Sequence, residues 1–206
     1  MNALSQDFIL LETRVGELKN KFMEGQLQDE KQNPVSFLPD LEFSAAYKLL
    51  VHAEIQDYLE KKARKGLSLI ESDVNANGLN TSYFKIIIAI AIPFMSDLKV
   101  RISHPLNDKD FKDAVKAIIE KARYFINNNN GIKNKSFTIL SLMSCSFKDP
   151  FDSVLIANLD SYGQARGDVA HRSVKSVQSI NSPISEVGYV EQILKGFRIH
   201  FYGVST

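Results

Sequence analysis

Apolar residues recur every three or four positions along most of this chain of 206 residues. The first such stripe consists of Leu4, Phe8, Leu11, Val15, Leu18 and Phe22. Because side chains at this spacing share one face of an α-helix, the pattern predicts a helix with one buried stripe. The same spacing predicts further helices over approximately residues 40–65, 107–127, 136–145, 150–166 and 183–201. We therefore expect an all-α fold, in which residues 1–39 form an N-terminal helix-and-loop extension and residues 40–206 form a helical domain.

The run from Ile86 to Ile92 is apolar on every side and is interpreted as a buried helix. Its β-branched residues leave a strand as the alternative. An exposed part of this run would suit a dimer interface. The longest apolar run, Ile86 to Phe94, is far shorter than a membrane span and is interrupted by Pro93, so no membrane association is expected.

Charge and cysteine content narrow the possible environments and partners. The net charge of +1 gives no strong global field for nucleic acid, so any RNA site would be a local patch. Cys145 is the only cysteine, which excludes a disulfide within the chain and favours a reducing compartment. The first residues lack the basic and apolar regions of a signal peptide. A soluble cytoplasmic protein is therefore expected.

The sequence offers no pattern typical of a metal or cofactor site. Its four histidines are dispersed, and with a single cysteine they show no metal-ligand spacing. No glycine-rich phosphate-binding motif occurs. We therefore expect neither a bound metal nor a cofactor. His104 and His200 have no patterned partner and are interpreted as structural.

The most informative stretch for function is Arg-Gly-Asp-Val-Ala-His, residues 166–171. Arg166 can neutralise charge on a phosphate under attack, and His171 can transfer a proton near neutral pH. Five residues of regular helix turn a side chain about 140° beyond one full turn, so the two would not share a face. Either a bend at Gly167 or the meeting of two copies of the chain would bring them together. The alternative is a capping or ion-pair role with Asp160 or Asp168.

Three segments together resemble the RiboL-PSP-HEPN branch of the HEPN superfamily, which occurs in prokaryotic defence and toxin loci. They are HAEIQDYLE at residues 52–60, NNGIKNK at 129–135 and LDSYGQARGDVAHR at 159–172. The last contains the arginine and histidine of the superfamily's Arg-x4-6-His signature. The resemblance covers roughly residues 40–200, and the third segment is the most specific.

The resemblance implies a HEPN-like helical bundle that forms a homodimer and acts as a metal-independent endoribonuclease. Carried over by position, Arg166 and His171 are the catalytic pair. Many members have a polar residue directly after the arginine, where this chain has Gly167; Asp168 is the candidate substitute, and orienting or capping the chain is its other role. The expected reaction is attack of the ribose 2′-hydroxyl on the adjacent phosphate, which leaves a 2′,3′-cyclic phosphate and a 5′-hydroxyl.

Partners and alternatives follow from the same comparison. The candidate basic rim for the RNA backbone consists of Lys133, Lys135, Arg172 and Lys175, with scattered surface charge as the alternative. The family setting implies a toxin or phage-defence effector that is held in check by an antitoxin or another defence-system protein. A catalytically inactive module that binds RNA or a partner protein is the second interpretation, and a structural helical bundle is the third. His52 and Glu54 are interpreted as part of a packed or solvated helix face. Alternatively, a buried Glu54 carboxylate near Arg166 would fix the orientation of the guanidinium.

Overall fold

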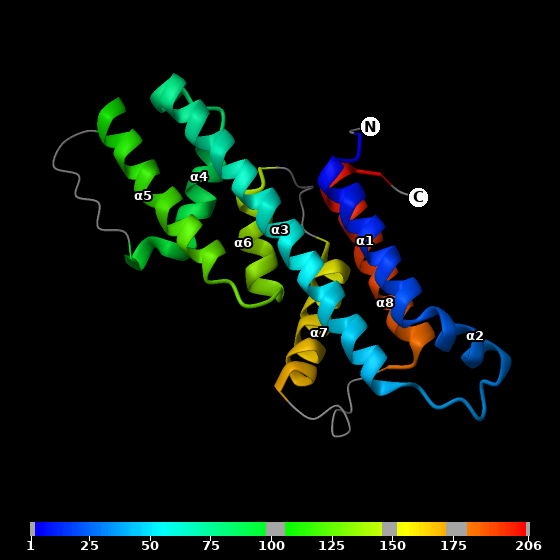
Figure 1. The fold of residues 1–206 in the computed structure, drawn as a ribbon. Coiled ribbons are helices and arrows are strands. Elements are labelled where there is room, and N and C mark those ends of the chain that lie inside the picture. The colour runs from blue at the N-terminus through cyan, green and yellow to red at the C-terminus, as the bar shows by residue number, and fades with distance from the viewer. Residues whose placement is uncertain (1–2, 98–105, 146–151, 172–180, 205–206) are drawn as a thin grey trace. The chain divides into compact units, whose positions relative to one another are not determined.

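The computed structural model describes residues 3–97, 106–145, 152–171 and 181–204. Over these residues the chain is all-α, as predicted, and contains no strand. The elements are α1 (Gln6–Phe22), α2 (Glu24–Gln32), α3 (Leu41–Asn77), η1 (Gly78–Asn80), α4 (Phe84–Ala91), η2 (Ile92–Asp97), α5 (Asp108–Asn127), α6 (Asn134–Met143), α7 (Ser153–His171), α8 (Pro183–Phe197) and a π-helical turn, η4 (Arg198–Tyr202). Figure 1 shows their order along the chain.

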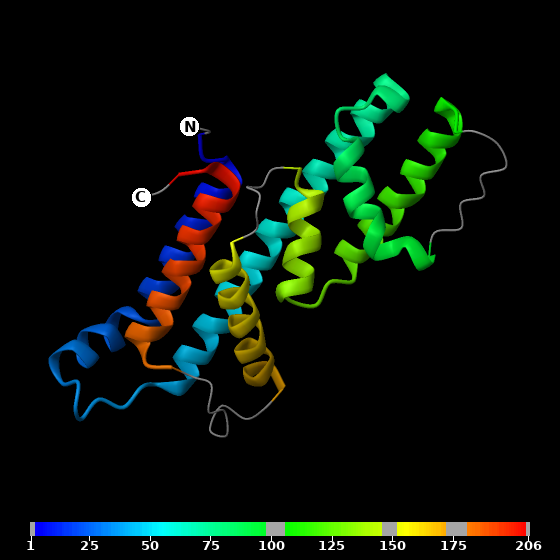
Figure 2. The same cartoon turned by 180° about the vertical axis from the view of Figure 1, so that it is seen from behind.

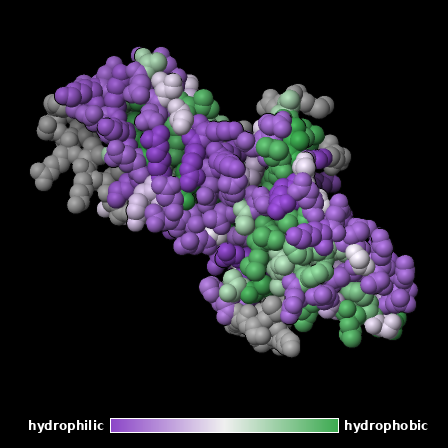
Figure 3. Space-filling model, viewed as in Figure 1, coloured by the Kyte–Doolittle hydropathy of each residue, from purple (hydrophilic) through white to green (hydrophobic). Residues whose placement is uncertain are grey.

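The helices belong to two compact units. Unit 1 comprises the described residues within Met1–Tyr58, Gly131–Asn134 and Lys148–Thr206, and unit 2 those within Leu59–Asn130 and Lys135–Phe147. Helix α3 contributes its first half to unit 1 and its second half to unit 2. Helices α1 and α2, which precede the boundary predicted at residue 39, lie within unit 1. The division of the chain at that residue stays a prediction. Hydrophilic side chains cover much of the face shown in Figure 3, with apolar side chains between them.

Helix α1 is tied to the C-terminal end of unit 1. Ser5 caps its N-terminus by accepting the backbone N–H of Phe8, as serine commonly does at this position. The Ser5 hydroxyl also lies 2.6 Å from the Tyr202 hydroxyl, and the Phe8 ring packs on those of Tyr58 and Tyr202. Figures 1 and 2 both show α1 alongside α8. The predicted stripe of α1 therefore packs into the core of unit 1: Phe8, Leu11, Val15 and Leu18 are buried.

Two glycines in unit 1 permit close helix packing. A Cβ on Gly163, in the middle of α7, would collide with the carbonyl oxygen of Ile132. A Cβ on Gly196, in α8, would stand 2.7 Å from a methyl carbon of Leu155. These contacts bring α7 against the segment 131–134 on one side and against α8 on the other. Glycine suits both positions, because a Cβ at residue 163 would meet the backbone and a Cβ at residue 196 would displace the Leu155 side chain.

Unit 2 contains the most strongly amphipathic helix, α5, which Asn107 caps by accepting the N–H of Asp110. The Phe111 ring stacks on Phe84 at 5.9 Å, and Phe125 meets Phe94 edge-on at 5.9 Å. Helix α4 confirms the helical interpretation of the isoleucine run. Its burial is one-sided, however: Ile87 and Ile90 are buried, whereas Phe84, Ile88 and Ile92 are exposed.

Two predicted helix ends are wrong. The helix expected to stop at Gly66 continues to Asn77, because Gly66 allows the close approach of the Met143 and Ser144 carbonyls rather than ending the helix. The helix expected to end near Arg166 continues to His171. Among the described residues no single helix is long and apolar enough to cross a membrane; only the bent pair 41–80 and 84–96 passes a test of length and composition.

Candidate functional site

The predicted catalytic residues lie on one continuous helix of unit 1, α7. Gly167 is part of this helix and has open space where a Cβ would stand. The chain therefore does not bend between Arg166 and His171, and the five-residue spacing directs the two side chains about 140° apart around the helix. Of the two arrangements considered from the sequence, the bend at Gly167 is absent. The meeting of two copies is untested by a single chain.

Arg166 and His171 have different environments. Arg166 is partly buried, and its Nε is inaccessible to solvent, without an acceptor among the residues that the structure describes. His171 is exposed and is the last residue of α7. Asp168 is partly buried and lies two positions after Arg166, about 200° around the helix. An Asp168 carboxylate there cannot orient the guanidinium of its own chain.

The candidate basic residues fall into different parts of the molecule. Lys133 is exposed in the segment 131–134 of unit 1, and its Cγ lies 3.3 Å from where a Cβ on Gly163 would stand. Gly163 and Arg166 are three residues apart and so share a face of α7. Lys135 is exposed at the start of α6 and belongs to unit 2. Arg172 and Lys175 lie outside the described residues.

His52, on α3, is buried beside α7, the helix that contains residues 166–171 and is called the motif helix below. It is only 2% exposed, and its Nε2 accepts the backbone N–H of Ile132 at 3.2 Å. Its ring stacks on that of Tyr162 with a centroid separation of 6.2 Å. Burial, and then the positive charge of Arg166, lower the pKa of His52 to about 4. At neutral pH the ring is therefore uncharged, and its proton is on Nδ1 because Nε2 is the acceptor.

The Nδ1 of His52 is a second buried donor without a partner within the described ranges. The charge of Arg166 is the second cause of the lowered pKa of His52. Tyr162, whose ring stacks on that of His52, lies four residues before Arg166 on the same face of α7. An unsatisfied buried donor costs roughly 1–3 kcal/mol. A folded protein seldom leaves such a donor without a partner. The sequence missed this pair, because His52 and Arg166 belong to different helices and no spacing rule relates them.

A buried ion pair lies on the other side of Tyr162. Lys48 Nζ, on α3, is 3.1 Å from Glu186 Oε2, on α8, and both side chains are 1% exposed. Lys48 Nζ also stands 5.5 Å from the centre of the Tyr162 ring, and the Tyr162 hydroxyl donates to the Lys48 carbonyl at 3.4 Å. Burial raises the pKa of Tyr162 above its ordinary value, so the phenol keeps its proton. This network links the motif helix, α7, to α3 and α8.

Two of the carboxylates considered as partners for Arg166, Glu54 and Asp160, bind other groups, and so does the buried Glu186. Glu54 accepts from Arg14 Nε at 3.2 Å. Asp160 Oδ1 accepts the backbone N–H of Asn134 at 3.1 Å. Glu186 accepts from Asn181 at 3.2 Å in addition to Lys48. Among the residues that the structure describes, no carboxylate forms an ion pair with Arg166.

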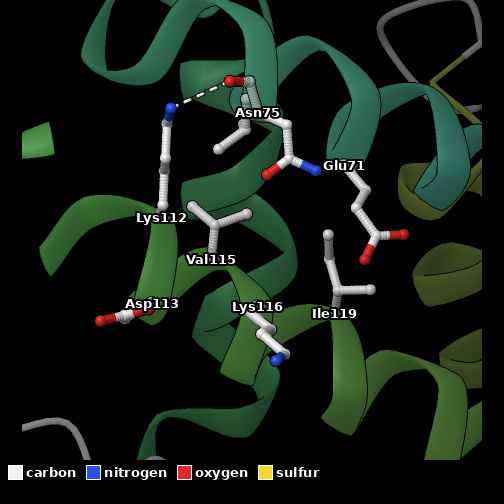
Figure 4. Close-up of a pocket in the computed structure, with 8 residues that line it drawn as sticks. Glu71, Asn75, Lys112, Asp113, Val115, Lys116 and Ile119 are labelled. Carbon is white, nitrogen blue, oxygen red and sulfur yellow. Dashed lines mark hydrogen bonds between the residues drawn. The ribbon is translucent and has the colours of Figure 1, made fainter. Parts of the chain in front are cut away.

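A separate hollow of about 270 Å³ lies in unit 2 between α3 and α5. Figure 4 shows Lys112 reaching across it to the Asn75 carbonyl, a hydrogen bond of 2.9 Å. Glu71, on its edge, pairs with Arg123 at 2.6 Å. The hollow contains none of the predicted catalytic residues. Within the described ranges no group of three or more histidine, cysteine, aspartate or glutamate side chains is arranged to hold a metal ion.

Comparisons with protein-family models, with curated proteins and with solved structures find no match to this chain. Membership of the HEPN superfamily therefore stays a prediction that is based on the three sequence segments.

Proposed function

We propose that this protein is a metal-independent endoribonuclease in which Arg166 and His171 are the catalytic residues. The observation that carries the proposal is the state of Arg166, a partly buried cation whose Nε has no acceptor among the described residues. Arginine binds phosphate oxygens through paired N–H donors and keeps its charge at all accessible pH values. His171 on the same helix is exposed to solvent, where a polynucleotide can reach it.

The reaction is the attack of a ribose 2′-oxygen on its own 3′-phosphate. A histidine removes the 2′-hydroxyl proton, the O2′–P bond forms, and the P–O5′ bond breaks. The leaving 5′-oxygen takes up a proton, so the products are a 2′,3′-cyclic phosphate and a 5′-hydroxyl. Arg166 stabilises the charge that develops on the non-bridging oxygens. No redox change or metal is needed in this sequence of steps.

A homodimer suits this chemistry better than a single chain. In-line displacement places the attacking and leaving oxygens on opposite sides of phosphorus, so a base and an acid are needed on two sides. In a twofold dimer, His171 of one copy acts beside Arg166 of the other copy as the base, and water supplies the proton to the leaving 5′-oxygen. The pairing also overcomes the angle of about 140° that separates Arg166 from His171 on α7.

The biological role that we propose is that of a toxin or phage-defence effector in the cytoplasm. An antitoxin or another defence-system protein is the proposed inhibitory partner. This role is supported by the resemblance of residues 52–60, 129–135 and 159–172 to the HEPN branch described above.

The test uses the purified protein and a labelled RNA in buffer that contains EDTA. We expect the wild type to cut the RNA and to leave 2′,3′-cyclic phosphate and 5′-hydroxyl ends. Arg166→Ala and His171→Ala should each lose most cleavage while they keep the helical circular-dichroism spectrum. Products with 5′-phosphate ends that require a divalent metal would refute the proposal, as would equal activity of the three proteins.

The second candidate is an inactive module that binds RNA or a partner protein. Gly167 favours it, because this position is polar in many members of the resembled superfamily and here offers no side chain at all. An RNA that binds the wild type but is never cut, under conditions in which Arg166→Ala abolishes binding, would support this candidate.

A further inference from the structure

We propose that the loop between α2 and α3, residues 33–40, is the docking site for a partner protein whose own surface is apolar and bordered by lysine and arginine. We call these residues the docking loop. Its sequence is Asn-Pro-Val-Ser-Phe-Leu-Pro-Asp, and Figure 1 shows it where the chain passes from α2 to α3. The proposal goes beyond the endoribonuclease function and does not depend on it, because the docking loop contains none of the predicted catalytic or RNA-binding residues.

Two apolar side chains of the docking loop lie almost entirely in solvent. Val35 is 100% exposed and Leu38 is 87% exposed, the two highest values among the large apolar residues that the structure describes. Phe43, in the first turn of α3, is half exposed and packs edge-on against Phe22 at 5.8 Å. A single exposed apolar side chain is common on protein surfaces, whereas a group of them marks a site of interaction.

The docking loop is held in shape by hydrogen bonds at both of its ends. At its start, the Asn33 carbonyl accepts the N–H of Ser36 at 3.2 Å. Pro34 occupies the second position of this turn, for which its fixed φ is suited. At its other end, the Asp40 N–H donates to Gln26 Oε1 at 2.7 Å. The exposed apolar side chains are therefore presented on a fixed backbone, which reduces the entropy lost when a partner binds.

Carboxylates flank the docking loop on both sides. Asp29 and Glu30 lie in the last turn of α2, and Asp40 and Glu42 stand at the N-terminus of α3. Lys31 is the only cation between them. The segment therefore has a net negative charge, which attracts a basic surface and repels the phosphates of nucleic acid and of anionic lipid.

A protein that binds here must match both the apolar and the acidic character of the segment. An apolar surface removes Val35 and Leu38 from water, and lysine or arginine around that surface pairs with the flanking carboxylates. The buried apolar contacts supply most of the affinity, and the charges at the rim set the rate and the specificity of binding. A second copy of this chain is a poor match, because a twofold interface would bring two identical acidic rims together.

The probes are two amphipathic helical peptides of equal length, each with leucine on one face. The other face has lysine in the first peptide and glutamate in the second. In backbone amide NMR of the wild type, we expect the lysine peptide to shift signals within residues 33–43 and the glutamate peptide to leave them unchanged. Equal shifts with both peptides, shifts only elsewhere, or no response to the lysine peptide would overturn the proposal.

The apolar contacts are tested by the double variant Val35→Ser, Leu38→Ser, for which Leu10→Ser is the matched control. Leu10 is also exposed and lies on α1 of the same unit, away from the docking loop. The double variant should bind the lysine peptide at least about tenfold more weakly than the wild type, whereas Leu10→Ser should bind it equally well. Equal binding by the double variant and the wild type would contradict the proposal. Circular dichroism establishes that each variant is folded.

The charge requirement is tested by the double variant Asp29→Asn, Glu42→Gln. Asp40 is left unchanged because its carboxylate accepts the N–H groups of Glu42 and Phe43, and Glu30 because it accepts the N–H of Ile184. The variant should bind the lysine peptide more weakly than the wild type, and its binding should depend less on salt. An unchanged affinity and salt dependence would overturn the acidic part of the proposal, and with it the basic partner.

Other occupants of the docking loop give different results. A wild-type dimer that Val35→Ser, Leu38→Ser dissociates in sedimentation would make the loop an interface between copies, and would overturn the proposal. Binding to phosphatidylglycerol vesicles that the same variant loses would overturn it in favour of a membrane. Since this variant leaves Arg166 and His171 unchanged, it should cut RNA as the wild type does. A wild type that cuts no RNA but binds the lysine peptide at residues 33–43 would reject the nuclease and leave the docking loop intact.

Discussion

Lys48 Nζ lies 3.1 Å from Glu186 Oε2, and both side chains are 1% exposed. Two charges at this depth are costly to remove from water, and their attraction offsets the cost only while both are present. The pair joins α3 to α8 at the level where Tyr162 of α7 packs against Lys48. The position of the motif helix therefore depends on an ion pair between two other helices.

Removal of one partner of this ion pair should be strongly destabilising. We expect Lys48→Met to lower the free energy of unfolding by roughly 3–5 kcal/mol, because it leaves the Glu186 carboxylate buried without its cation. The double variant Lys48→Met, Glu186→Leu should recover much of that loss. Urea unfolding followed by circular dichroism measures both. The control is the surface pair of the half-buried Lys19 and the exposed Glu191, 3.0 Å apart, where Lys19→Met should cost about 1 kcal/mol or less. A double variant as unstable as Lys48→Met alone would contradict this account.

The stability of the protein should depend on pH through His52. Burial and the charge of Arg166 lower the pKa of His52 to about 4, against an ordinary value of 6.5 in the unfolded chain. Below pH 6.5 the unfolded chain therefore binds this proton more readily than the folded protein does, so stability is lost as the pH falls toward 4. The full effect is about 3 kcal/mol, from the shift in pKa.

Urea unfolding between pH 7 and pH 5 measures the slope, and His52→Gln provides the control because it removes this proton without removing the side chain's polarity. The slope should be smaller in His52→Gln than in the wild type. In Arg166→Ala the NMR-determined pKa of His52 should rise only part of the way to 6.5, since burial is the larger cause. Identical slopes in the wild type and His52→Gln would show that His52 is not protonated differently in the two states.

The two glycines of α7 near the motif should respond in opposite ways to alanine. A Cβ on Gly163 would collide with the Ile132 carbonyl, so Gly163→Ala should destabilise the protein and displace the segment that positions His52. A Cβ on Gly167 meets nothing, and alanine is preferred to glycine inside a helix. Gly167→Ala should therefore stabilise the protein by about 0.5–1 kcal/mol. Thermal unfolding measures both, and a shift in the same direction for the two variants would be inconsistent with the packing described.

Local pattern predicts the helices of this protein well and predicts their environment poorly. The apolar spacing of α1 and α5 and the cap at Asn107 depend on neighbouring residues, so the sequence indicates them correctly. Glycine often ends a helix, but Gly66 lies inside α3, where it packs against the carbonyl of Met143, far along the chain. The contacts of His52 with Ile132 and of Lys48 with Glu186 are of the same long-range kind. No periodicity encodes them. Arg166 and His171 were identified from a motif, whereas their different burial comes from tertiary packing.

The composite site can be tested by mixing two inactive variants. If Arg166 of one copy acts with His171 of the other, a heterodimer of Arg166→Ala and His171→Ala retains one intact site, formed by the unmodified arginine and histidine. Random exchange of subunits then makes half of the dimers heterodimers, each with one of two sites, so about a quarter of wild-type activity should return. If both groups act from the same chain, each subunit of every mixed dimer lacks one of them, and activity stays at the level of the separate variants.

Cleavage of a labelled RNA by the two variants, separately and after mixing and refolding from urea, distinguishes these results. Sedimentation of the wild type at micromolar concentration provides the control, because a monomer there would exclude the exchange on which the expected recovery depends.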